Sequence, residues 1–204
     1  MIDKNIPKSV VARLPLYLHY LRSVSADRES ISSSAVARAV RLGEVQVRKD
    51  LAMVSGKGKP KTGYVTSELV DSIMEVLGCV DGKNAVIVGA GHLGAALLAY
   101  KGFSEYNIRI IGAFDSDEKK RGTDLYGKSV MAIEEMSDYC KHNDVSIGII
   151  TVPEVAAQEV CDRLIEAGIM TIWSFAPIRL EVPDYVRLKE ENMAASLSAL
   201  AANV

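Results

Sequence analysis

A glycine-rich stretch in the middle of the chain has the residue types and spacing of a loop that binds a pyrophosphate. The pattern G-x-G-x-x-G is formed by Gly89, Gly91 and Gly94 within VIVGAGHLGAAL, residues 86–97. In such a loop the first glycine allows a tight turn, the second lets the backbone approach the pyrophosphate, and the third lets the helix pack closely on the strand. We therefore expect the cofactor-binding residues of this loop to be Gly89, Ala90, Gly91, His92, Leu93 and Gly94.

An acidic residue stands where a dinucleotide-binding fold needs one. The apolar run IRIIGAFD predicts a second strand that ends in Asp115, 21 residues beyond Gly94. A carboxylate at this place accepts hydrogen bonds from the adenine ribose and repels a 2′-phosphate, which favours NAD(H) over NADP(H). Lys119, Lys120 and Arg121 follow closely enough to weaken that preference. The alternative is an αβ domain with a merely glycine-rich turn, but the order of strand, glycine pattern, helix, strand and acid favours a dinucleotide site.

The rest of this part of the chain predicts the sheet that positions the loop. Two more buried strands are expected in VSIGIITVP and MTIWSFAP, with an amphipathic helix closed by Gly168 between them. Strands and helices that alternate at this spacing indicate a parallel, doubly wound sheet, with ligand contacts at the carboxyl ends of the strands. Thr151, Pro153, Phe175 and Pro177 occupy such ends and are candidate pocket walls, although a proline there can also serve only to stop a strand.

The charges divide the chain into two unequal parts. Residues 1–63 hold 12 Lys and Arg against 5 Asp and Glu, whereas residues 64–204 hold 12 against 21. A basic segment beside an acidic remainder is typical of a module that binds a polyanion. The alternative is a helical domain with a solvated basic surface.

The basic segment predicts a row of helices. A first helix follows Pro7, with a kink at Pro15, and a second is capped by serines 32–34 and ends at Gly43 in the left-handed conformation. A third, EVQVRKDLAMV, has an apolar stripe, and its opposite face is expected to carry Gln46, Lys49, Asp50 and Met53, with Arg48 at the edge. A connecting helix is expected at residues 67–78, capped by Ser67 and stopped by Gly78.

Two helices joined by a glycine-containing turn are the layout by which a second helix enters the major groove of DNA. The stretch SGKGKPKTGYV follows directly and predicts a basic ribbon that tracks phosphates or the minor groove, as a wing does. A flexible basic linker is the alternative. The candidate DNA-binding residues are Gln46, Arg48, Lys49, Lys57, Lys59 and Lys61.

Other classes of protein fit the sequence less well. The three cysteines have neither the number nor the spacing of a disulfide framework or a zinc site, so we expect them to be reduced and structural. No signal peptide or membrane span is evident, which predicts a cytoplasmic protein. No histidine stands at a strand end beside an acid, and too little chain follows the glycine loop for a substrate domain, so we expect no enzyme. The rivals are a small NAD-dependent oxidoreductase or cofactor-binding subunit with a basic appendage, and a nucleoid-type binder with a nonfunctional loop.

Several long blocks together resemble one family, over nearly the whole chain and in the family's order. VARLPLYLHYL, VQVRKDL, VIVGAGHLG, the GAFD strand end, TVPEVAAQEVCDRLIEAGI and SFAPIRLEVP are similar to the Rex family of redox-sensing transcriptional repressors. The resemblance implies a winged-helix DNA-binding domain at residues 1–78, a Rossmann domain for NADH and NAD+ at 79–189, and a C-terminal helix at 190–204 that is exchanged within a homodimer. It also implies that the protein binds double-stranded operator DNA, represses genes for NADH reoxidation and fermentation, and is released when NADH binds.

The resemblance also assigns roles to single residues. Gln46, Arg48 and Lys49 fall in the recognition helix and Lys59 in the wing, while Tyr100 matches a tyrosine near the nicotinamide. Arg13 matches a basic residue that pairs with an acid at the start of the exchanged helix, as an interdomain switch.

The chain departs from the family pattern at several of these places. Asn192 takes the place of the acid and Ser196 that of a later glutamate, while Ser174 stands for an asparagine. The wing has Val54-Ser55 and Pro60-Lys61 where the family has other pairs. We expect a neutral hydrogen bond between Arg13 and Asn192 in place of an ion pair, or else that Asn192 only caps the last helix.

Overall fold

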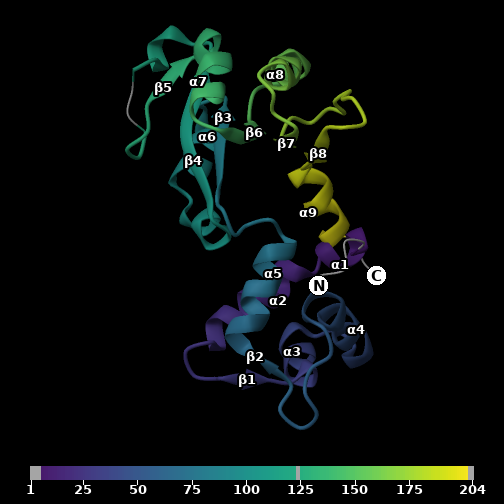
Figure 1. The fold of residues 1–204 in the computed structure, drawn as a ribbon. Helices are drawn as coiled ribbons and strands as arrows, with labels where there is room; N and C mark the ends of the chain where they lie inside the picture. Colours follow the sequence, from purple (N-terminus) through teal and green to yellow (C-terminus); the bar gives the residue numbers. More distant parts are fainter. Residues whose placement is uncertain (1–5, 123–124, 202–204) are drawn as a thin grey trace. The chain divides into compact units, whose positions relative to one another are not determined.

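The computed structural model describes residues 6–122 and 125–201. Its chain divides into two compact units, residues 1–81 and 82–204, which are described separately (Figure 1). No helix among the described residues is long and apolar enough to cross a membrane.

The N-terminal unit contains helices and a small two-stranded sheet. Its elements are α1 Lys8–Val11, α2 Leu14–Val24, β1 Ser30–Ile31, α3 Ser33–Val40, α4 Glu44–Ser55, β2 Tyr64–Val65 and α5 Thr66–Val76. The expectation of one helix kinked at Pro15 was wrong, because α1 and α2 are separate and Pro15 lies in the first turn of α2. A proline is tolerated there since its missing amide would have no partner within the helix.

The corner between α3 and α4 differs from the expected one in a single detail. Ser32 caps α3 as expected, accepting a hydrogen bond from the amide of Ala35. The left-handed residue at the end of α3 is Arg41, with φ of 55°, whereas Gly43 has φ of −65° and is the N-cap of α4. The expected role of Gly43 was therefore wrong: the chain turns two residues earlier, where the amide of Leu42 reaches back to the carbonyl of Ala37.

The basic stretch after α4 forms a paired ribbon. Strand β1 pairs antiparallel with β2, and Lys59 and Gly63 exchange backbone hydrogen bonds of 2.7 and 2.8 Å. Gly63 has φ of +83°, and a Cβ there would collide with the carbonyl of Ile31. The hydrogen bonds support the wing that the sequence predicts over a flexible linker.

Helix α5 begins one residue earlier than expected. Its N-cap is Val65, without a side-chain bond, and Ser67 lies exposed in the first turn, so the expected Ser67 cap was wrong. Gly78 has φ of +65°, and the amide of Cys79 returns to the carbonyl of Met74, which ends the helix as the sequence predicts.

A buried acid joins α4 to α2. Asp50 is 3% exposed, so its expected place on the polar face of α4 was wrong. Its position three residues after Val47 and four before Val54 puts it on the buried stripe. The Nε and Nη2 of Arg13 donate to Asp50 at 2.7 and 2.9 Å, and the hydroxyl of Tyr17 donates at 2.7 Å. These bonds raise the pKa of Arg13, and burial together with Asp50 raises the pKa of Tyr17 to about 12.

The C-terminal unit is a doubly wound α/β fold. Its strands are β3 Lys83–Val88, β4 Ile108–Asp115, β5 Val130–Ala132, β6 Val145–Ile150, β7 Thr171–Ser174 and β8 Arg187–Glu190. Its helices are α6 His92–Ala99, α7 Met136–His142, α8 Glu154–Glu166 and α9 Met193–Ala201, with short 3-10 turns at Lys101–Tyr106, Glu118–Lys120 and Ile133–Glu135. Among the described residues these strands form one parallel sheet in the order β5-β4-β3-β6-β7-β8, which is the Rossmann order.

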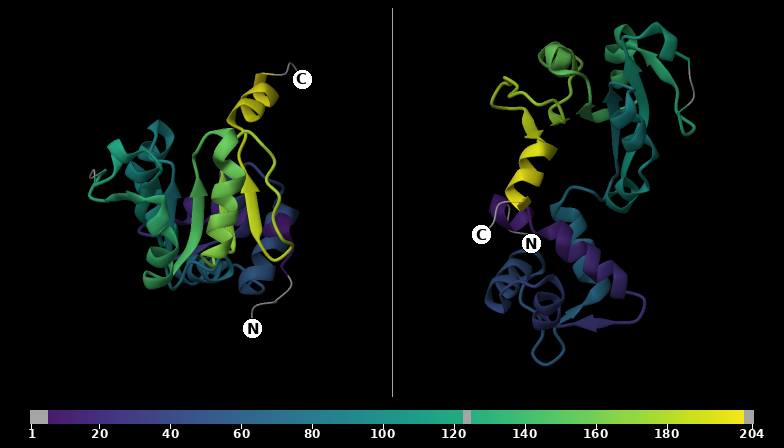
Figure 2. Two further views of the ribbon diagram at one scale, coloured as in Figure 1. Left: turned by 90° about the horizontal axis from the view of Figure 1, so that it is seen from above. Right: turned by 180° about the vertical axis from the view of Figure 1, so that it is seen from behind.

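Both faces of this sheet are covered, as its continuous apolar strands require. Along β3 the side chains of Val86 and Val88 join the cluster beneath α7 and α8, whereas Ala85 and Ile87 join the cluster that contains Leu98 of α6. Figure 2 shows α8 lying along one face of the sheet.

The cysteines are buried and unbonded, as expected. Burial raises the pKa of Cys140 and of Cys161 to about 11, so both thiols stay protonated and inert near neutral pH. No group of His, Cys, Asp and Glu side chains in the described part of the chain could hold a metal ion.

The contact of Asp50 with Arg13 and Tyr17 predicts a stability effect confined to the N-terminal unit. We expect Asp50→Ala to destabilise this unit by about 2–4 kcal/mol, because the buried hydroxyl of Tyr17 and the partly buried guanidinium of Arg13 lose their acceptor, and Tyr17→Phe by only about 1 kcal/mol. Urea unfolding followed by far-ultraviolet circular dichroism measures both. The fluorescence of Trp173 reports the other unit and is expected to be unchanged, and an unaltered circular dichroism midpoint for Asp50→Ala would contradict the prediction.

Candidate functional site

The turn from β3 to α6 contains three glycines, two of them in close contacts that exclude a side chain. Gly89 has φ of +105°, and a Cβ there would lie 2.7 Å from the carbonyl oxygen of Thr151. A Cβ on Gly94 would collide with the carbonyl of Gly89, whereas Gly91 faces open space. These contacts agree with the separate roles that the sequence predicts: a tight turn, close packing of helix on strand, and room for a ligand at Gly91.

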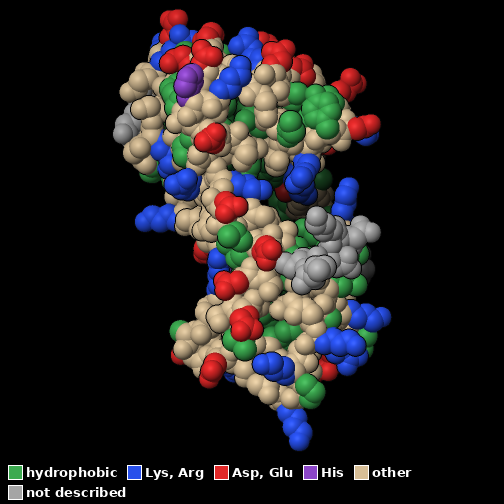
Figure 3. Space-filling model, in the orientation of Figure 1, with side chains coloured by type: hydrophobic (Ala, Val, Ile, Leu, Met, Phe, Trp, Pro, Cys, Tyr) green, Lys and Arg blue, Asp and Glu red, His purple; other side chains and the backbone are tan. Residues whose placement is uncertain are grey.

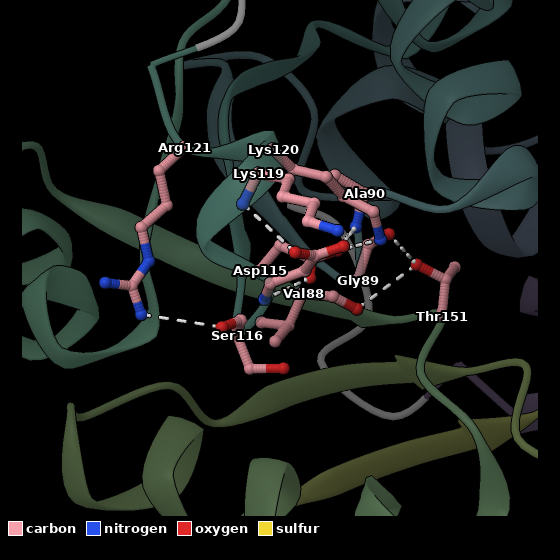
Figure 4. Close-up of polar contacts among 10 residues, drawn as sticks. Val88, Gly89, Ala90, Asp115, Ser116, Lys119, Lys120, Arg121 and Thr151 are labelled. Atoms are coloured by element: carbon pink, nitrogen blue, oxygen red, sulfur yellow. Dashed lines mark hydrogen bonds and ion pairs between the residues drawn. The ribbon is translucent and has the colours of Figure 1, made fainter.

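Asp115 is the last residue of strand β4 and lies beside this turn, where its carboxylate accepts three hydrogen bonds (Figure 4). Oδ2 accepts from the amide of Ala90 at 2.7 Å and from Nζ of Lys120 at 2.9 Å, and Oδ1 accepts from the amide of Asp117 at 2.8 Å. Burial alone would raise the pKa of Asp115, but the hydrogen bonds from Lys120 and the two amides outweigh it and hold the pKa below its ordinary value. The acid is therefore ionised, and it ties the end of β4 to the glycine loop.

Thr151 joins the glycine loop to the next strand of the sheet. Its hydroxyl lies 2.7 Å from the carbonyl oxygen of Gly89 and 3.1 Å from that of Val88, and its amide donates to Val88. Pro153 follows as the N-cap of α8. Since β3 and β6 are neighbours whose connecting chains leave in opposite directions along the sheet, this is the switch point where such folds bind ligands.

A cleft of about 750 Å³ opens at this edge of the sheet. Its volume lies in the range of cofactor sites. Of the expected residues it is lined by Gly89, Gly91, Leu93, Asp115, Thr151, Pro153 and Phe175. The structure thus brings together side chains from the ends of four strands and the start of α8.

Other expected residues lie outside this lining. The amide of Ala90 points to Asp115, Gly94 packs on the strand, and His92 is the exposed first residue of α6. Tyr100 ends α6 with 61% of its surface exposed, and its ring packs edge-on against Phe103 at 5.1 Å. Tyr100 lines a separate hollow of about 550 Å³, and Pro177 lines another.

Several residues that line the cleft were not predicted from the sequence. Glu134, Glu159 and Arg163 line it, together with Ile133 and Val152. Glu159 and Arg163 stand four residues apart on α8 and form an ion pair of 2.8 Å. That spacing was visible in the sequence, but only the fold shows that this face of α8 meets the end of the sheet.

The N-terminal unit presents the candidate DNA-binding residues to solvent. Gln46, Arg48 and Lys49 are exposed on α4, and Lys57, Lys59 and Lys61 are exposed on the ribbon. Figure 3 shows Lys and Arg side chains in blue over α4 and at the tip of the ribbon. Among the described residues no salt bridge engages these cations.

Arg13 and Asn192 each have a partner within their own unit. Arg13 is bound to Asp50, and Oδ1 of Asn192 accepts a hydrogen bond from the amide of Ala195 at 2.9 Å, which caps α9. The capping alternative for Asn192 is therefore present in the structure. A contact between Arg13 and Asn192 would join the two units and stays a prediction.

Family models match both parts of the chain. Residues 5–52 match a family described as "Putative DNA-binding protein N-terminus", and residues 81–178 match "CoA binding domain". Curated relatives match almost the whole length of this chain. The redox-sensing transcriptional repressor Rex of Treponema denticola is 39% identical over 98% of this chain and 96% of its own, and that of Carboxydothermus hydrogenoformans is 38% identical with the same coverage.

Solved structures of RSP, a Rex-family repressor, also match nearly the whole chain. RSP in complex with β-NAD+ and operator DNA has a TM-score of 0.90 at 34% identity, covering 98% of this chain and 92% of that one. RSP in complex with β-NADH has a TM-score of 0.83 at 33% identity, covering 98% and 94%. Similarity of this extent, in sequence and in fold, shows that the chain belongs to the Rex family of redox-sensing transcriptional repressors.

Proposed function

We propose that this protein is a transcriptional repressor that binds operator DNA, senses the ratio of NADH to NAD+, and leaves the operator when NADH binds. The observation that carries the proposal is the cleft at the Rossmann switch point, formed on a chain whose relatives are named redox-sensing repressors. RSP, its structural neighbour, has been solved with NAD+ and operator DNA and with NADH. Because the relatives are regulators, the coenzyme is a signal here and not a reactant.

The glycine loop and the strand ends bind the dinucleotide. The backbone at Gly91 approaches the pyrophosphate, Leu93, Thr151 and Pro153 form walls, and Asp115 lies at the adenine ribose. The residues at this site stay those named from the sequence, with Tyr100 placed near the nicotinamide by the resemblance alone.

The charge of the nicotinamide ring supplies the redox discrimination. NAD+ carries a cationic pyridinium, whereas NADH carries a neutral dihydropyridine. A cation among apolar walls without a partner is costly to bury, so a pocket that closes around the ring favours NADH. A coupling of about 1–3 kcal/mol between coenzyme and DNA gives a switch of about five- to hundredfold.

The N-terminal unit supplies the DNA contacts. Helix α4 enters the major groove with Gln46, Arg48 and Lys49, and the lysines of the ribbon follow the phosphates. The bonds from Arg13 and Tyr17 to Asp50 fix α4 on α2, so that its exposed face is presented in one orientation.

The proposed repressor acts as a homodimer. Helix α9 exposes Met193, Leu197 and Leu200, by 59%, 66% and 82%, and such an apolar helix is suited to insertion into a second copy.

The domains remain proposed at residues 1–78, 79–189 and 190–204, of which 202–204 lie outside the described residues. A rotation of the two subunits would move paired recognition helices out of register with major grooves about 34 Å apart. A cytoplasmic location follows from binding to chromosomal DNA.

The switch is tested by a gel-shift titration on a palindromic promoter fragment with NADH and NAD+ added separately. We expect NADH to lower the affinity for the fragment by about five- to hundredfold and NAD+ to leave it nearly unchanged. If NADH leaves the affinity unchanged at physiological concentrations, the proposed function is wrong.

The roles of the exposed cations are tested by single substitutions. We expect Arg48→Ala to cost about 1–3 kcal/mol of operator binding and to reduce the preference over unrelated DNA. Lys59→Ala should instead weaken binding to any duplex and lower the slope of log affinity against log salt by about 1. Lys141→Ala, exposed on α7, is the matched control and should change neither quantity. Equal losses for Lys59→Ala and Lys141→Ala would remove the ribbon from the interface.

A further inference from the structure

Helix α4 exposes an apolar side chain on the face that the proposed function turns toward DNA. Val45 is the second residue of this helix and is 56% exposed. Arg48, Lys49 and Ala52 follow it by three, four and seven residues and so share its face of the helix, and both cations are exposed. The buried stripe of α4, which contains Asp50, lies on the opposite side. An exposed apolar group therefore stands beside the cations on this face.

The two residues on either side of Val45 contact other helices. Oγ of Ser34 on α3 donates to Oε2 of Glu44 at 3.2 Å. The carboxamide of Gln46 satisfies its surroundings when its oxygen faces Arg13, where it accepts from Nη1 at 3.2 Å and from Nε at 3.3 Å. Glu44 is thus tied to α3 and the oxygen of Gln46 to the start of α2. Val45, between them, is left to face outward in the first turn of α4.

The major groove offers one apolar group for such a side chain. The first residues of a recognition helix contact the edges of the bases. Among the bases only thymine presents a methyl group in this groove, whereas the other groups there donate or accept hydrogen bonds. A valine side chain can neither donate nor accept, so the thymine methyl is the group that it fits. Its β-branched side chain also has few rotamers to lose on contact.

We infer that Val45 is a specificity-determining residue, which recognises thymine by packing against its C5-methyl group in each half-site of the operator. The inference rests on the proposed function and adds the base that this position selects. Arg48 and Lys49 flank the contact and supply attraction to DNA, whereas Val45 supplies selection without charge.

The test replaces thymine by deoxyuridine, which removes the methyl group and keeps the hydrogen-bonding groups of the base. One thymine at a time is exchanged in both half-sites of the palindromic promoter fragment, and gel shift measures the dissociation constant of the full chain without NADH. At one thymine position we expect about fourfold weaker binding per half-site, the effect of about one methyl group lost from a buried contact. In Val45→Ala the same exchange should change the affinity by less than about twofold, because the contact is already absent.

The matched control is Val155→Ala, the same substitution at a 95% exposed valine of α8 that does not line the cleft. It should keep the full effect of deoxyuridine. Alanine favours a helix more than valine does, so Val45→Ala should remain folded, which far-ultraviolet circular dichroism checks.

If no thymine position distinguishes the unmodified chain from Val45→Ala, the inference is wrong and the proposed function stands. If the unmodified chain binds the promoter fragment no better than unrelated DNA, the proposed function and the inference both fail.

Discussion

The close approach of α6 to the ends of β3 and β6 is the contact on which the proposed coenzyme site depends. Gly94 sits against the carbonyl of Gly89, and Gly89 against that of Thr151, at separations that leave no room for a Cβ. Because the helix starts so near the strands, the backbone at Gly91 faces open space where a pyrophosphate can approach a helix N-terminus. The bond from Ala90 to Asp115 then fixes the loop to β4, so the turn, the acid and the cleft form one connected arrangement.

In the N-terminal unit a buried charge likewise fixes the position of a helix. Asp50 accepts hydrogen bonds from Arg13, the N-cap residue of α2, and from Tyr17 within α2. Its neighbours Arg48 and Lys49 on α4 face solvent. A buried ion pair contributes little net stability against an apolar alternative, but it fixes geometry, since a partner without its counterpart is costly. The orientation of α4, the proposed recognition helix, depends on such a constraint. The two units therefore each hold a binding surface in place through polar contacts made at their cores.

Short sequence patterns predicted the main strands and helices correctly, but several helix ends and the features that depend on distant partners were predicted wrongly. The glycine loop, the strand ending in Asp115 and the helix closed by Gly168 follow from short patterns, and the structure contains all three. The burial of Asp50 depends on Arg13, 37 residues earlier, so the polarity of the residue alone placed it on the wrong face. Strands β1, β5 and β8 are only two to four residues long, and no pattern in the sequence predicted them. Lys120 was recognised as a nearby cation, yet only the fold shows that it binds Asp115.

Binding of NADH to Gly94→Ala tests most directly whether the glycine contacts create the coenzyme site. We expect titration calorimetry to show at least a tenfold weaker affinity, by about 1.4 kcal/mol or more, because the added methyl forces α6 away from Gly89. Far-ultraviolet circular dichroism should show that the chain remains folded. Gly43→Ala is the matched control, since a Cβ there meets nothing within 4 Å, and should bind NADH normally. Affinity equal to that of the unmodified chain in Gly94→Ala would contradict the account.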